Sequence, residues 1–332
     1  MRAIVWTKYG DPDGLQLQEV EKPVPKDSEV LIRVHAATVT AGDCEMRRLQ
    51  LPLSLGLPVR LYAGLARPTR IRILGQELAG EIEAVGKDVA RFKKGDEVFG
   101  TTGFAFGAYA EYNCLPAESD GGALAIKPAN VTYGEAAAIP TAGLEALHFL
   151  RVADLQSGQS ILINGAGGSI GTFALQLAKL SGAEVTAVDS AAKLEMLCSL
   201  GADHIIDYAR EDFTKSGQTY DVILDVVGKS PYAGSVNALK PNGFYLIANP
   251  SLSTMFRGQW TSMTSSKTVF QSPADQTTED LNHLKELIEA GKIEMVIDRA
   301  YPLEQMAEAH RYVETGQKKG NVVITVVPAD GT

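Results

Sequence analysis

The chain has 332 residues, enough for about two domains, and its 45% apolar and 21% charged residues are typical of a globular protein. Its formal net charge of −9 disfavours nucleic acid or an anionic membrane as the default partner. No apolar run approaches the ~18 residues of a membrane-spanning helix, so we expect neither partner.

The cysteines and the N-terminus indicate a compartment. Cys44, Cys114 and Cys198 lie far apart, which favours reduced thiols over a disulfide framework. Residues 1–6 lack the apolar core of a signal peptide and are typical of a first strand. We therefore expect a cytoplasmic protein.

Roughly the first 125 residues are predicted to be mostly β-structure, with turn signals between short apolar or alternating runs. The expected strands are residues 3–7, 15–20, 29–36, 78–85 and 107–112. An apolar and basic insert, residues 52–73, interrupts them and contains Tyr62 and four arginines. We expect a surface helix packed by its apolar side, with a lid over the substrate as the alternative.

From residue 135 the pattern changes to strands that alternate with helices. Helices are predicted at 135–139 and 144–150, with a break at 140–143 between them. The expected strands are residues 160–164, 184–188, 204–208, 222–227 and 244–248. This alternation predicts an α/β, doubly wound parallel sheet. Amphipathic helices at 278–290 and 302–315 and a strand at 321–327 complete the prediction.

A glycine cluster joins the strand at 160–164 to a helix, and the next strand ends on Asp189. Glycine lets the backbone approach a pyrophosphate, and free N–H groups at a helix start face phosphates. Asp189 stands where an acid can hold a ribose. The order favours a dinucleotide site over a glycine-rich turn without a ligand. The candidate phosphate-binding residues are Gly165, Ala166, Gly167, Gly168, Ser169, Ile170 and Gly171.

Motifs along the whole chain resemble the zinc-free quinone oxidoreductase branch of the medium-chain dehydrogenase/reductase superfamily. They are VTAGD at 39–43, GQELAG at 75–80, FKKGD at 92–96, GAYAEY at 107–112, PTAG at 140–143, the glycine cluster, SLGAD at 199–203 and GNVVI at 320–324. The resemblance implies a GroES-like, mostly-β substrate domain made of residues 1–126 and 297–332. It also implies a Rossmann dinucleotide-binding domain at 127–296, an active site in the cleft, and a homodimer.

The same resemblance bears on metal. Zinc-dependent members carry a cysteine where this chain has Thr40 and a histidine where it has Gln76, and neither replacement is a normal zinc ligand. Cys44 could be a shifted ligand, but an isolated thiol is favoured. We therefore expect no metal. Without a Lewis acid, simple alcohol oxidation is disfavoured, and acceptors that delocalise charge, such as quinones and α,β-unsaturated carbonyls, are favoured.

The sequence contains opposite indications for NADH and for NADPH as the coenzyme. Asp189 is the physical signature for NAD, because it accepts from ribose hydroxyls and repels a 2′-phosphate. Lys193 and Tyr208 match positions that bind the 2′-phosphate in NADPH-using relatives, and Ser190 begins the segment that carries Lys193. The alternative is that Lys193 is a solvated lysine at a helix start and that Tyr208 packs on the adenine. We place NADPH slightly ahead of NADH. Thr141 resembles the family threonine near the nicotinamide end of the coenzyme. Asn249, just after the expected strand at 244–248, and Val227 are further candidates for the coenzyme site.

For the chemistry, Thr40, Asp43 and Gln76 occupy the corner where zinc relatives hold metal. We expect Thr40, or a water ordered by Gln76, to hydrogen-bond the acceptor carbonyl as charge develops. Asp43 is either a catalytic group or, the favoured alternative, a buried structural acid. Tyr62 could supply a proton as a lid phenol.

These observations predict an NAD(P)H-dependent oxidoreductase that transfers hydride to a small-molecule quinone or enone without zinc. Two alternatives stay open. One is a zinc-independent alcohol or aldehyde dehydrogenase, and the other is a dinucleotide-binding sensor without turnover.

Overall fold

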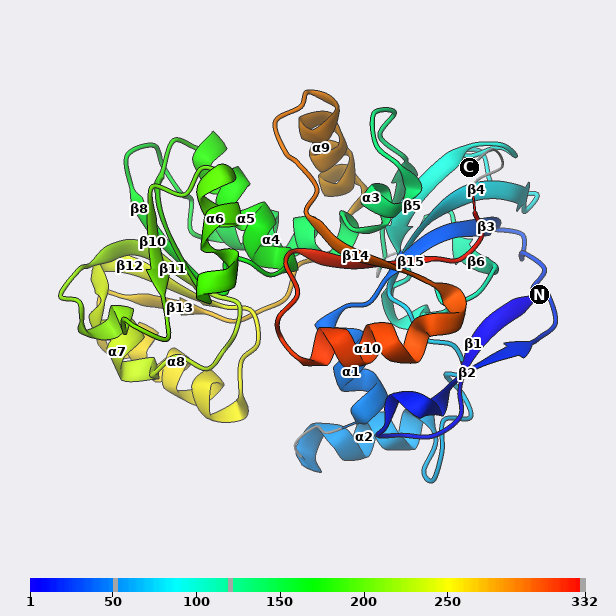
Figure 1. Cartoon of the computed structure of the whole chain (residues 1–332), viewed down its shortest axis with the longest axis horizontal. Coiled ribbons are helices and arrows are strands. Elements are labelled where there is room, and N and C mark those ends of the chain that lie inside the picture. Colours follow the sequence, from blue (N-terminus) through cyan, green and yellow to red (C-terminus); the bar gives the residue numbers. More distant parts are fainter. Residues whose placement is uncertain (50–52, 119–121, 329–332) are drawn as a thin grey trace. The chain divides into compact units, whose positions relative to one another are not determined.

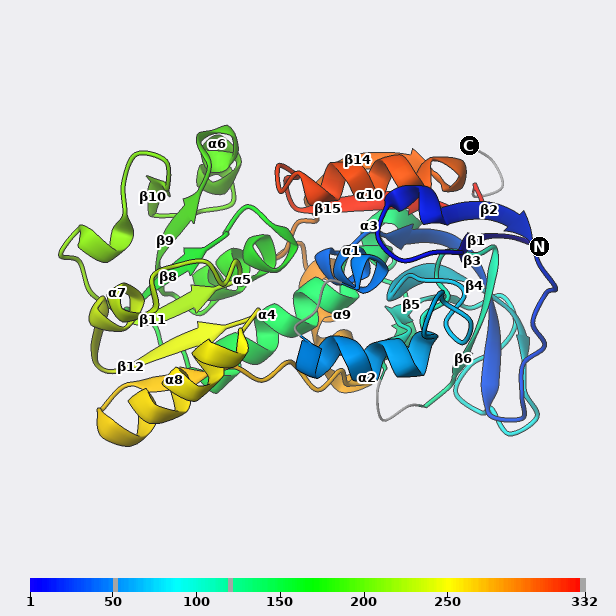
Figure 2. The ribbon, with the colours of Figure 1, turned by 90° about the horizontal axis from the view of Figure 1, so that it is seen from below.

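A computed structural model describes residues 1–49, 53–118 and 122–328 of the chain (Figures 1 and 2). Two compact units make up the molecule. The first consists of Met1–Thr141, Gln276–Glu289 and Met295–Thr332, and the second of Ala142–Asp275 and Ala290–Glu294. The first unit is therefore discontinuous in sequence.

The second unit is built on a six-stranded sheet in which all neighbouring strands are parallel, in the order β10-β9-β8-β11-β12-β13. The strands are β8 (Ser160–Asn164), β9 (Glu184–Asp189), β10 (His204–Asp207), β11 (Tyr220–Asp225), β12 (Leu239–Ile247) and β13 (Thr268–Phe270). The helices are α4 (Pro140–Val152), α5 (Ser169–Leu180), α6 (Ala191–Ser199), α7 (Tyr232–Asn237) and α8 (Leu252–Thr264). The strand order reverses between β8 and β11, which makes the sheet doubly wound, so the predicted α/β class is confirmed.

Burial explains why β8 and α5 form the centre of this unit. Ile161, Leu162 and Ile163 of β8 have no exposed surface, as expected for a strand covered on both faces. Residues 171–178 of α5 are all buried, so this helix lies inside the unit. The position and orientation of the turn between β8 and α5 are thereby constrained from both sides.

The first unit holds a seven-stranded sheet in the order β14-β15-β3-β4-β5-β7, with β6 paired to β3, and a two-stranded sheet β1-β2. Its strands are β1 (Arg2–Trp6), β2 (Leu15–Glu19), β3 (Glu29–Thr38), β4 (Glu77–Val85), β5 (Glu97–Thr101), β6 (Tyr112–Pro116), β7 (Leu124–Ile126), β14 (Ile297–Pro302) and β15 (Asn321–Thr325). Its helices are α1 (Ala41–Arg48), α2 (Leu53–Ala63), α3 (Tyr133–Ala137), α9 (Thr278–Glu289) and α10 (Met306–Glu314). Short 3₁₀ turns occur in this unit at Pro12–Gly14, Gly103–Ala105 and Leu303–Gln305, and in the second unit at Phe213–Lys215.

The two ends of the chain share the core of the first unit. β15 pairs antiparallel with β3, as Figure 1 shows for the red and blue strands. Ile4 and Trp6 near the start pack in one hydrophobic cluster with Tyr301 and Ile324 near the end. The strands before and after the second unit in the sequence therefore form one sheet.

The units differ in their limits from the expected domain bounds. Residues 127–141 and 276–289 cluster with the first unit rather than with the parallel sheet. The side-chain amide of Asn130 donates to the Ile288 carbonyl at 2.9 Å, and α9 buries Leu281 and Leu284 there.

The expected strand at 107–112 is wrong. Phe106 and Gly107 have φ of 56° and 100°, which interrupts an extended strand, and β6 begins only at Tyr112. Tyr109 instead connects two segments, since its carbonyl accepts from Ile4 N at 2.8 Å and its N–H donates to the Leu74 carbonyl at 3.1 Å. Alternation alone was misleading here because a buried loop can also alternate.

The expected helix break at 140–143 is also misplaced. Pro140 is the first residue of α4, a position that tolerates proline because the N–H there has no intrahelical partner. The interruption falls at Ala138 and Ile139 instead.

The basic insert forms α2 and a loop. Ala63 at the end of the helix is fully buried, whereas Leu61, Tyr62 and Leu65 are 61%, 50% and 65% exposed. A surface helix is therefore present, but part of its apolar side is not packed. Within residues 1–49, 53–118 and 122–328, no helix has the length and apolar character needed to cross a bilayer.

Candidate functional site

The turn between β8 and α5 requires glycine at two positions. Gly165 has φ of 84°, and a Cβ there would lie 2.6 Å from Cγ2 of Val227. A Cβ on Gly171 would lie 2.4 Å from the Gly165 carbonyl oxygen. Gly168 is the N-cap of α5 and offers no side-chain acceptor to the first amides of this helix. Such a helix start can bind a phosphate group.

Asp189 at the end of β9 turns toward this glycine turn. Its Oδ2 accepts from the Gly167 N–H at 2.8 Å, and its Oδ1 accepts from the Ser190 N–H at 2.8 Å. Nζ of Lys193 lies 3.2 Å from Oδ1, and both side chains are 7% exposed. Asp189, which favours NADH, and Lys193, which favours NADPH, therefore form one buried ion pair.

The neighbouring predicted residues gather around this pair. Ser190 is the N-cap of α6, whose first turn carries Lys193. Tyr208 is 62% exposed, and its N–H donates to the Asp189 carbonyl at 3.2 Å. A Cβ on Gly167 would lie 2.5 Å from Cδ of Lys193, so the lysine stem covers the glycine turn.

Asp225, a buried carboxylate at the end of β11, was missed by the sequence reasoning. Its Oδ1 accepts from Nδ2 of Asn164 at 2.9 Å and from the N–H groups of Val227 and Gly228 at 3.1 and 2.9 Å. Its Oδ2 accepts from the Tyr245 hydroxyl at 3.0 Å. An acid that ends the strand next to the glycine turn was the signal that could have identified it.

Val227 and Asn249 lie along this same strand end. Val227 is 43% exposed, and Nδ2 of Asn249 donates to the Val226 carbonyl at 2.9 Å. The turn held by Asp225 thus carries one predicted coenzyme residue and contacts the other.

In the first unit, the structure brings Thr40, Asp43 and Gln76 together. Thr40 is the N-cap of α1, and its Oγ1 accepts from the Asp43 N–H at 3.0 Å. In return Asp43 Oδ2 accepts from the Thr40 N–H at 3.0 Å and lies 2.7 Å from Oγ1. Oε1 of Gln76 lies 3.4 Å from the same hydroxyl. This capping box determines the orientation of the Thr40 and Asp43 side chains, and Gln76 lies beside them.

Burial sets the electrostatics of this corner. Desolvation raises the pKa of the Asp43 carboxyl to about 6, although hydrogen bonds from Thr40 act in the opposite direction. Oδ1 of Asp43 and the hydroxyl of Tyr109 are buried without a hydrogen-bond partner within the described ranges. Burial and the Asp43 charge raise the pKa of Tyr109 well above its usual value. The environment of this corner therefore favours the neutral forms of Asp43 and Tyr109.

Glu77 is a second group that the sequence reasoning missed. It is buried, its Oε1 accepts from the Thr38 hydroxyl, and its Oε2 accepts from the Thr141 N–H at 2.8 Å. Burial raises its pKa. Oγ1 of Thr141 is itself buried and has no hydrogen-bond partner among the described residues, so this hydroxyl is available to a ligand.

Tyr62 is separate from this corner. It lies on α2 with its ring 4.4 Å from the Arg70 guanidinium carbon, and in the described ranges no hydrogen bond joins it to Thr40, Asp43 or Gln76. The structure therefore does not bring Tyr62 into the cluster as it does the other three candidates.

Cys44 lies beside a histidine rather than at Thr40. Its Sγ is 3.4 Å from Nδ1 of His310, and both side chains are buried. Burial raises the pKa of Cys44 to about 12 and lowers that of His310 to about 3. Among the described residues, no three histidine, cysteine or acidic side chains are grouped as a metal site.

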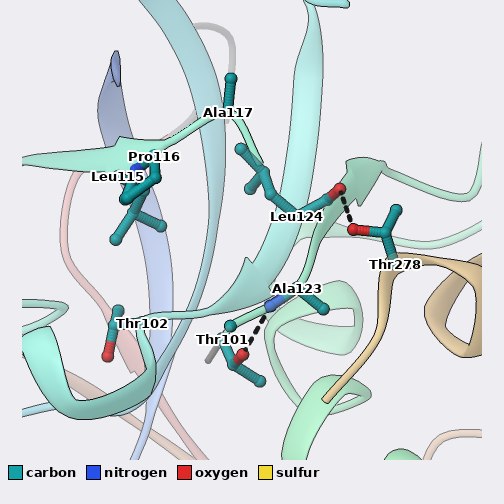
Figure 3. A pocket seen from close by; sticks show the side chains of 9 residues that line it. Thr101, Thr102, Leu115, Pro116, Ala117, Ala123, Leu124 and Thr278 are labelled. Carbon is teal, nitrogen blue, oxygen red and sulfur yellow. Dashed lines mark hydrogen bonds between the residues drawn. The ribbon is translucent and has the colours of Figure 1, made fainter. Parts of the chain in front are cut away.

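A small pocket of the first unit involves none of the predicted residues (Figure 3). It lies between the ends of β5, β6 and β7 and the start of α9. Thr101 Oγ1 accepts from the Ala123 N–H at 3.0 Å, and Thr278 Oγ1 donates to the Leu124 carbonyl at 3.5 Å (Figure 3). The hydroxyls of Thr101 and Thr278 hydrogen-bond neighbouring segments of the chain. Their position in the pocket wall therefore has a structural role.

Comparison with known proteins identifies the family. The family described as "Alcohol dehydrogenase GroES-like domain" matches residues 26–124, and "Zinc-binding dehydrogenase" matches residues 200–324. A 2-methylene-furan-3-one reductase from Solanum lycopersicum is 33% identical over 340 residues, covering 99% of this chain and 80% of that protein. The chain belongs to the quinone and enone oxidoreductases of the medium-chain dehydrogenase/reductase superfamily.

Two further comparisons agree. An NADPH-dependent alkenal/one oxidoreductase from Arabidopsis thaliana is 31% identical, covering 99% of this chain and 80% of that protein. The structure of the quinone oxidoreductase from Coxiella burnetii superposes with a TM-score of 0.88 at 30% identity, covering 98% of this chain and 99% of that one. The predicted family, the GroES-like and Rossmann fold and the oxidoreductase class are confirmed. The zinc-binding description covers neither Thr40 nor Gln76, so it leaves the metal prediction untested.

Proposed function

We propose that this oxidoreductase uses NADPH to reduce a small quinone or α,β-unsaturated carbonyl without zinc. The observation that carries the proposal is the corner at Thr40 and Gln76, where a hydroxyl and an amide occupy the positions of metal ligands in zinc-dependent relatives. The names of the reductase from Solanum lycopersicum and the alkenal/one oxidoreductase from Arabidopsis thaliana support the acceptor class.

The second unit fits a dinucleotide. The amides of residues 165–171 would bind the pyrophosphate, because a Cβ on Gly165 or Gly171 would fill the turn and the start of α5 has no side-chain cap. Thr141 would use its unpartnered hydroxyl, and Val227 and Asn249 would contact the nicotinamide half. NADPH when bound supplies the hydride. Ser190, Lys193 and Tyr208 would bind the 2′-phosphate, and Lys193 supports NADPH over NADH because it already lies against the glycine turn.

The first unit would bind the acceptor oxygen. We expect Thr40 to donate a hydrogen bond as negative charge develops on that oxygen. Its hydroxyl donates to Asp43 Oδ2 at 2.7 Å in the structure, so its one proton would turn from Asp43 to the acceptor, with Gln76 as its neighbour. Tyr62 remains a candidate proton donor from α2.

Side-by-side turnover assays test this function. We expect NADPH oxidation with phenanthrenequinone and with an enone, slower oxidation of NADH, and no reaction with a simple ketone. Elemental analysis after dialysis should find no stoichiometric zinc. Ketone turnover would favour the alcohol or aldehyde dehydrogenase, and coenzyme binding without any turnover would favour the sensor.

We also propose a homodimer and a cytoplasmic location. The resemblance supports the dimer, because relatives with this fold pair through the coenzyme domain. An exposed edge of the parallel sheet would also favour pairing with a second copy. The separated cysteines support a reducing compartment. Some relatives are named as chloroplastic or mitochondrial, so fractionation of native cells is the test of location.

A further inference from the structure

Positive charge is concentrated in one stretch of this acidic chain. Between Glu45 and Glu77 the sequence has six arginines and no acidic residue, although the whole chain carries −9. Two of these arginines, Arg47 and Arg48, pair with Glu314 of α10. The other four belong to α2 and the loop that follows it, so the partner predicted from net charge need not be the partner of this region.

Those four arginines have no acidic partner among the described residues. Arg60, Arg67, Arg70 and Arg72 are all exposed, and no carboxylate in the described part of the chain forms an ion pair with them. The guanidinium carbons of Arg60 and Arg70 lie 5.1 and 4.4 Å from the rings of Tyr9 and Tyr62 instead. Their charge is therefore available to an anionic partner.

Apolar side chains accompany this charge. Leu61 and Leu65 are 61% and 65% exposed, and Tyr62 is half-exposed. Arginine next to exposed leucine and an aromatic ring is the composition of segments that lie in a membrane interface, with the apolar groups at the acyl boundary and the guanidinium groups at the phosphates.

The backbone holds these side chains on an ordered support. The Tyr9 hydroxyl donates to the Gly64 carbonyl at 2.5 Å, and Thr69 N–H donates to the Ala63 carbonyl at 2.8 Å. Trp6 of β1 donates its N–H to the Arg72 carbonyl at 2.7 Å. In Figure 2, α2 can be followed from its label into the loop that returns toward β4. Little ordering is needed when a partner binds such a fixed segment.

We propose that Arg60–Arg72 is a docking face for an anionic lipid bilayer, on which the protein lies without crossing it. Charge complementarity favours lipid phosphates, because no carboxylate within residues 1–49, 53–118 and 122–328 pairs with the four arginines. The exposed leucines favour a bilayer over nucleic acid, since nucleic acid offers no apolar layer beneath its phosphates. Docking would bring the enzyme to acceptors dissolved in the membrane, but binding itself does not depend on the proposed function.

Vesicle binding of the full chain is the direct test. We expect co-sedimentation with vesicles of phosphatidylcholine and phosphatidylglycerol, at least tenfold weaker binding to phosphatidylcholine alone, and loss of binding at high salt. The triple variant Arg60→Gln, Arg67→Gln and Arg72→Gln should lose this binding at least tenfold. Its turnover of a water-soluble quinone should stay unchanged.

A matched control has the same change in charge elsewhere. Arg91→Gln, Lys93→Gln and Lys94→Gln alter three exposed cations of the loop before β5, and this variant should bind vesicles like the native chain. The variant Leu61→Ser and Leu65→Ser keeps every charge and should still bind less tightly. Thermal melting confirms that each variant is folded, and the salt and lipid dependence of the native chain tests the proposal if one is not.

Three results would overturn the proposal. One is no binding of the native chain to anionic vesicles. Another is equal loss of binding in the control triple variant, which would indicate a general effect of charge. The third is unchanged vesicle binding of the Arg60, Arg67 and Arg72 variant together with a changed mass in solution or a changed KM, which would make this segment a contact between copies or a lid.

Discussion

The ion pair of Asp189 and Lys193 changes what can be expected of each side chain in the coenzyme site. Both oxygens of Asp189 already accept hydrogen bonds from backbone N–H groups, and Lys193 lies against one of them. Asp189 is therefore part of the support of the glycine turn, whereas Lys193 has a flexible stem and can exchange its carboxylate partner for a phosphate.

The variant Lys193→Ala should weaken NADPH binding roughly ten- to a hundredfold and leave NADH binding nearly unchanged. The reason is the loss of one charge-assisted contact to the 2′-phosphate, worth about 1.5–3 kcal/mol. Fluorescence titration of both coenzymes measures it. As a control, Asp189→Ala should lower the free energy of unfolding by about 1–3 kcal/mol, because two amides lose their acceptor. Equal weakening of both coenzymes by Lys193→Ala would contradict the NADPH preference.

Asp43 predicts a pH dependence of stability. Its pKa is about 6 in the folded protein against an ordinary value of 3.8, so the folded state binds the proton more tightly than the unfolded state does. Asp43 therefore costs no stability at low pH, and its cost grows as pH rises from about 4 to about 6. Above that window the cost is constant at roughly 3 kcal/mol.

The variant Asp43→Asn removes this titration. Relative to the native chain, it should gain stability as pH rises from about 4 to about 6, and denaturant unfolding at several pH values measures the difference. Carboxylates that do not interact with Asp43 cancel in the comparison. The Asp43 charge helps to raise the pKa of Glu77, so the variant also removes that contribution. Parallel stability curves for the two proteins would show that Asp43 is not the group that titrates.

At the scale of elements, two glycines of the turn between β8 and α5 have different roles, one in packing and one in ligand binding. The Gly171 position is closed by the Gly165 carbonyl, whereas a Cβ on Gly168 would meet only that same oxygen at 3.5 Å, an ordinary contact. Gly168 also has φ of −89°, which any residue can adopt.

The variant Gly171→Ala should lower the free energy of unfolding by about 1–3 kcal/mol, because the extra methyl forces the turn and α5 apart. Gly168→Ala should leave stability within about 0.5 kcal/mol and weaken coenzyme binding, since its methyl stands where a pyrophosphate would approach. Thermal unfolding and coenzyme titration of both variants measure the two effects. A stable Gly171→Ala protein would contradict the close packing of this turn.

Prediction of elements succeeded where local pattern and packing agreed. β8 and α5 were predicted because a wholly apolar run, a glycine cluster and a 3.6-residue period follow one another, and all are buried in the structure. The segment at 107–112 alternates as well, but the positive φ of Gly107 and the contacts of Tyr109 with Ile4 and Leu74 override that pattern.

At the scale of the molecule, α8 and β13 indicate where a second copy would bind. Met255, Phe256, Trp260 and Met263 of α8 are between 48% and 77% exposed, and only Gly258 of this helix is buried. β13 pairs with β12 alone among the described strands, so one of its edges is open. Large apolar side chains beside an open strand favour self-association.

The variant Phe256→Glu and Trp260→Glu should convert the proposed dimer to a monomer at micromolar concentration, because the dimer would bury two charges without partners from each copy. Light scattering measures the mass. Val24→Glu is a suitable control, since Val24 is 83% exposed on the first unit and should not affect the mass. A monomeric native chain would contradict the dimer.

By itself, the sequence determined the local features of this protein: the glycine turn, the alternation of strands and helices, and the polar residues at Thr40 and Gln76. Those depend on backbone conformation and on neighbours within a few residues, which a pattern records. The tertiary structure decided the partners. Glu77 holds Thr141 across 64 positions, and Asp225 holds Asn164 across 61. β15 completes the sheet beside β3, and Asp189 turns inward to Gly167 and Lys193. A buried polar group must find its partner wherever the packed core places one, and sequence spacing carries no record of that position.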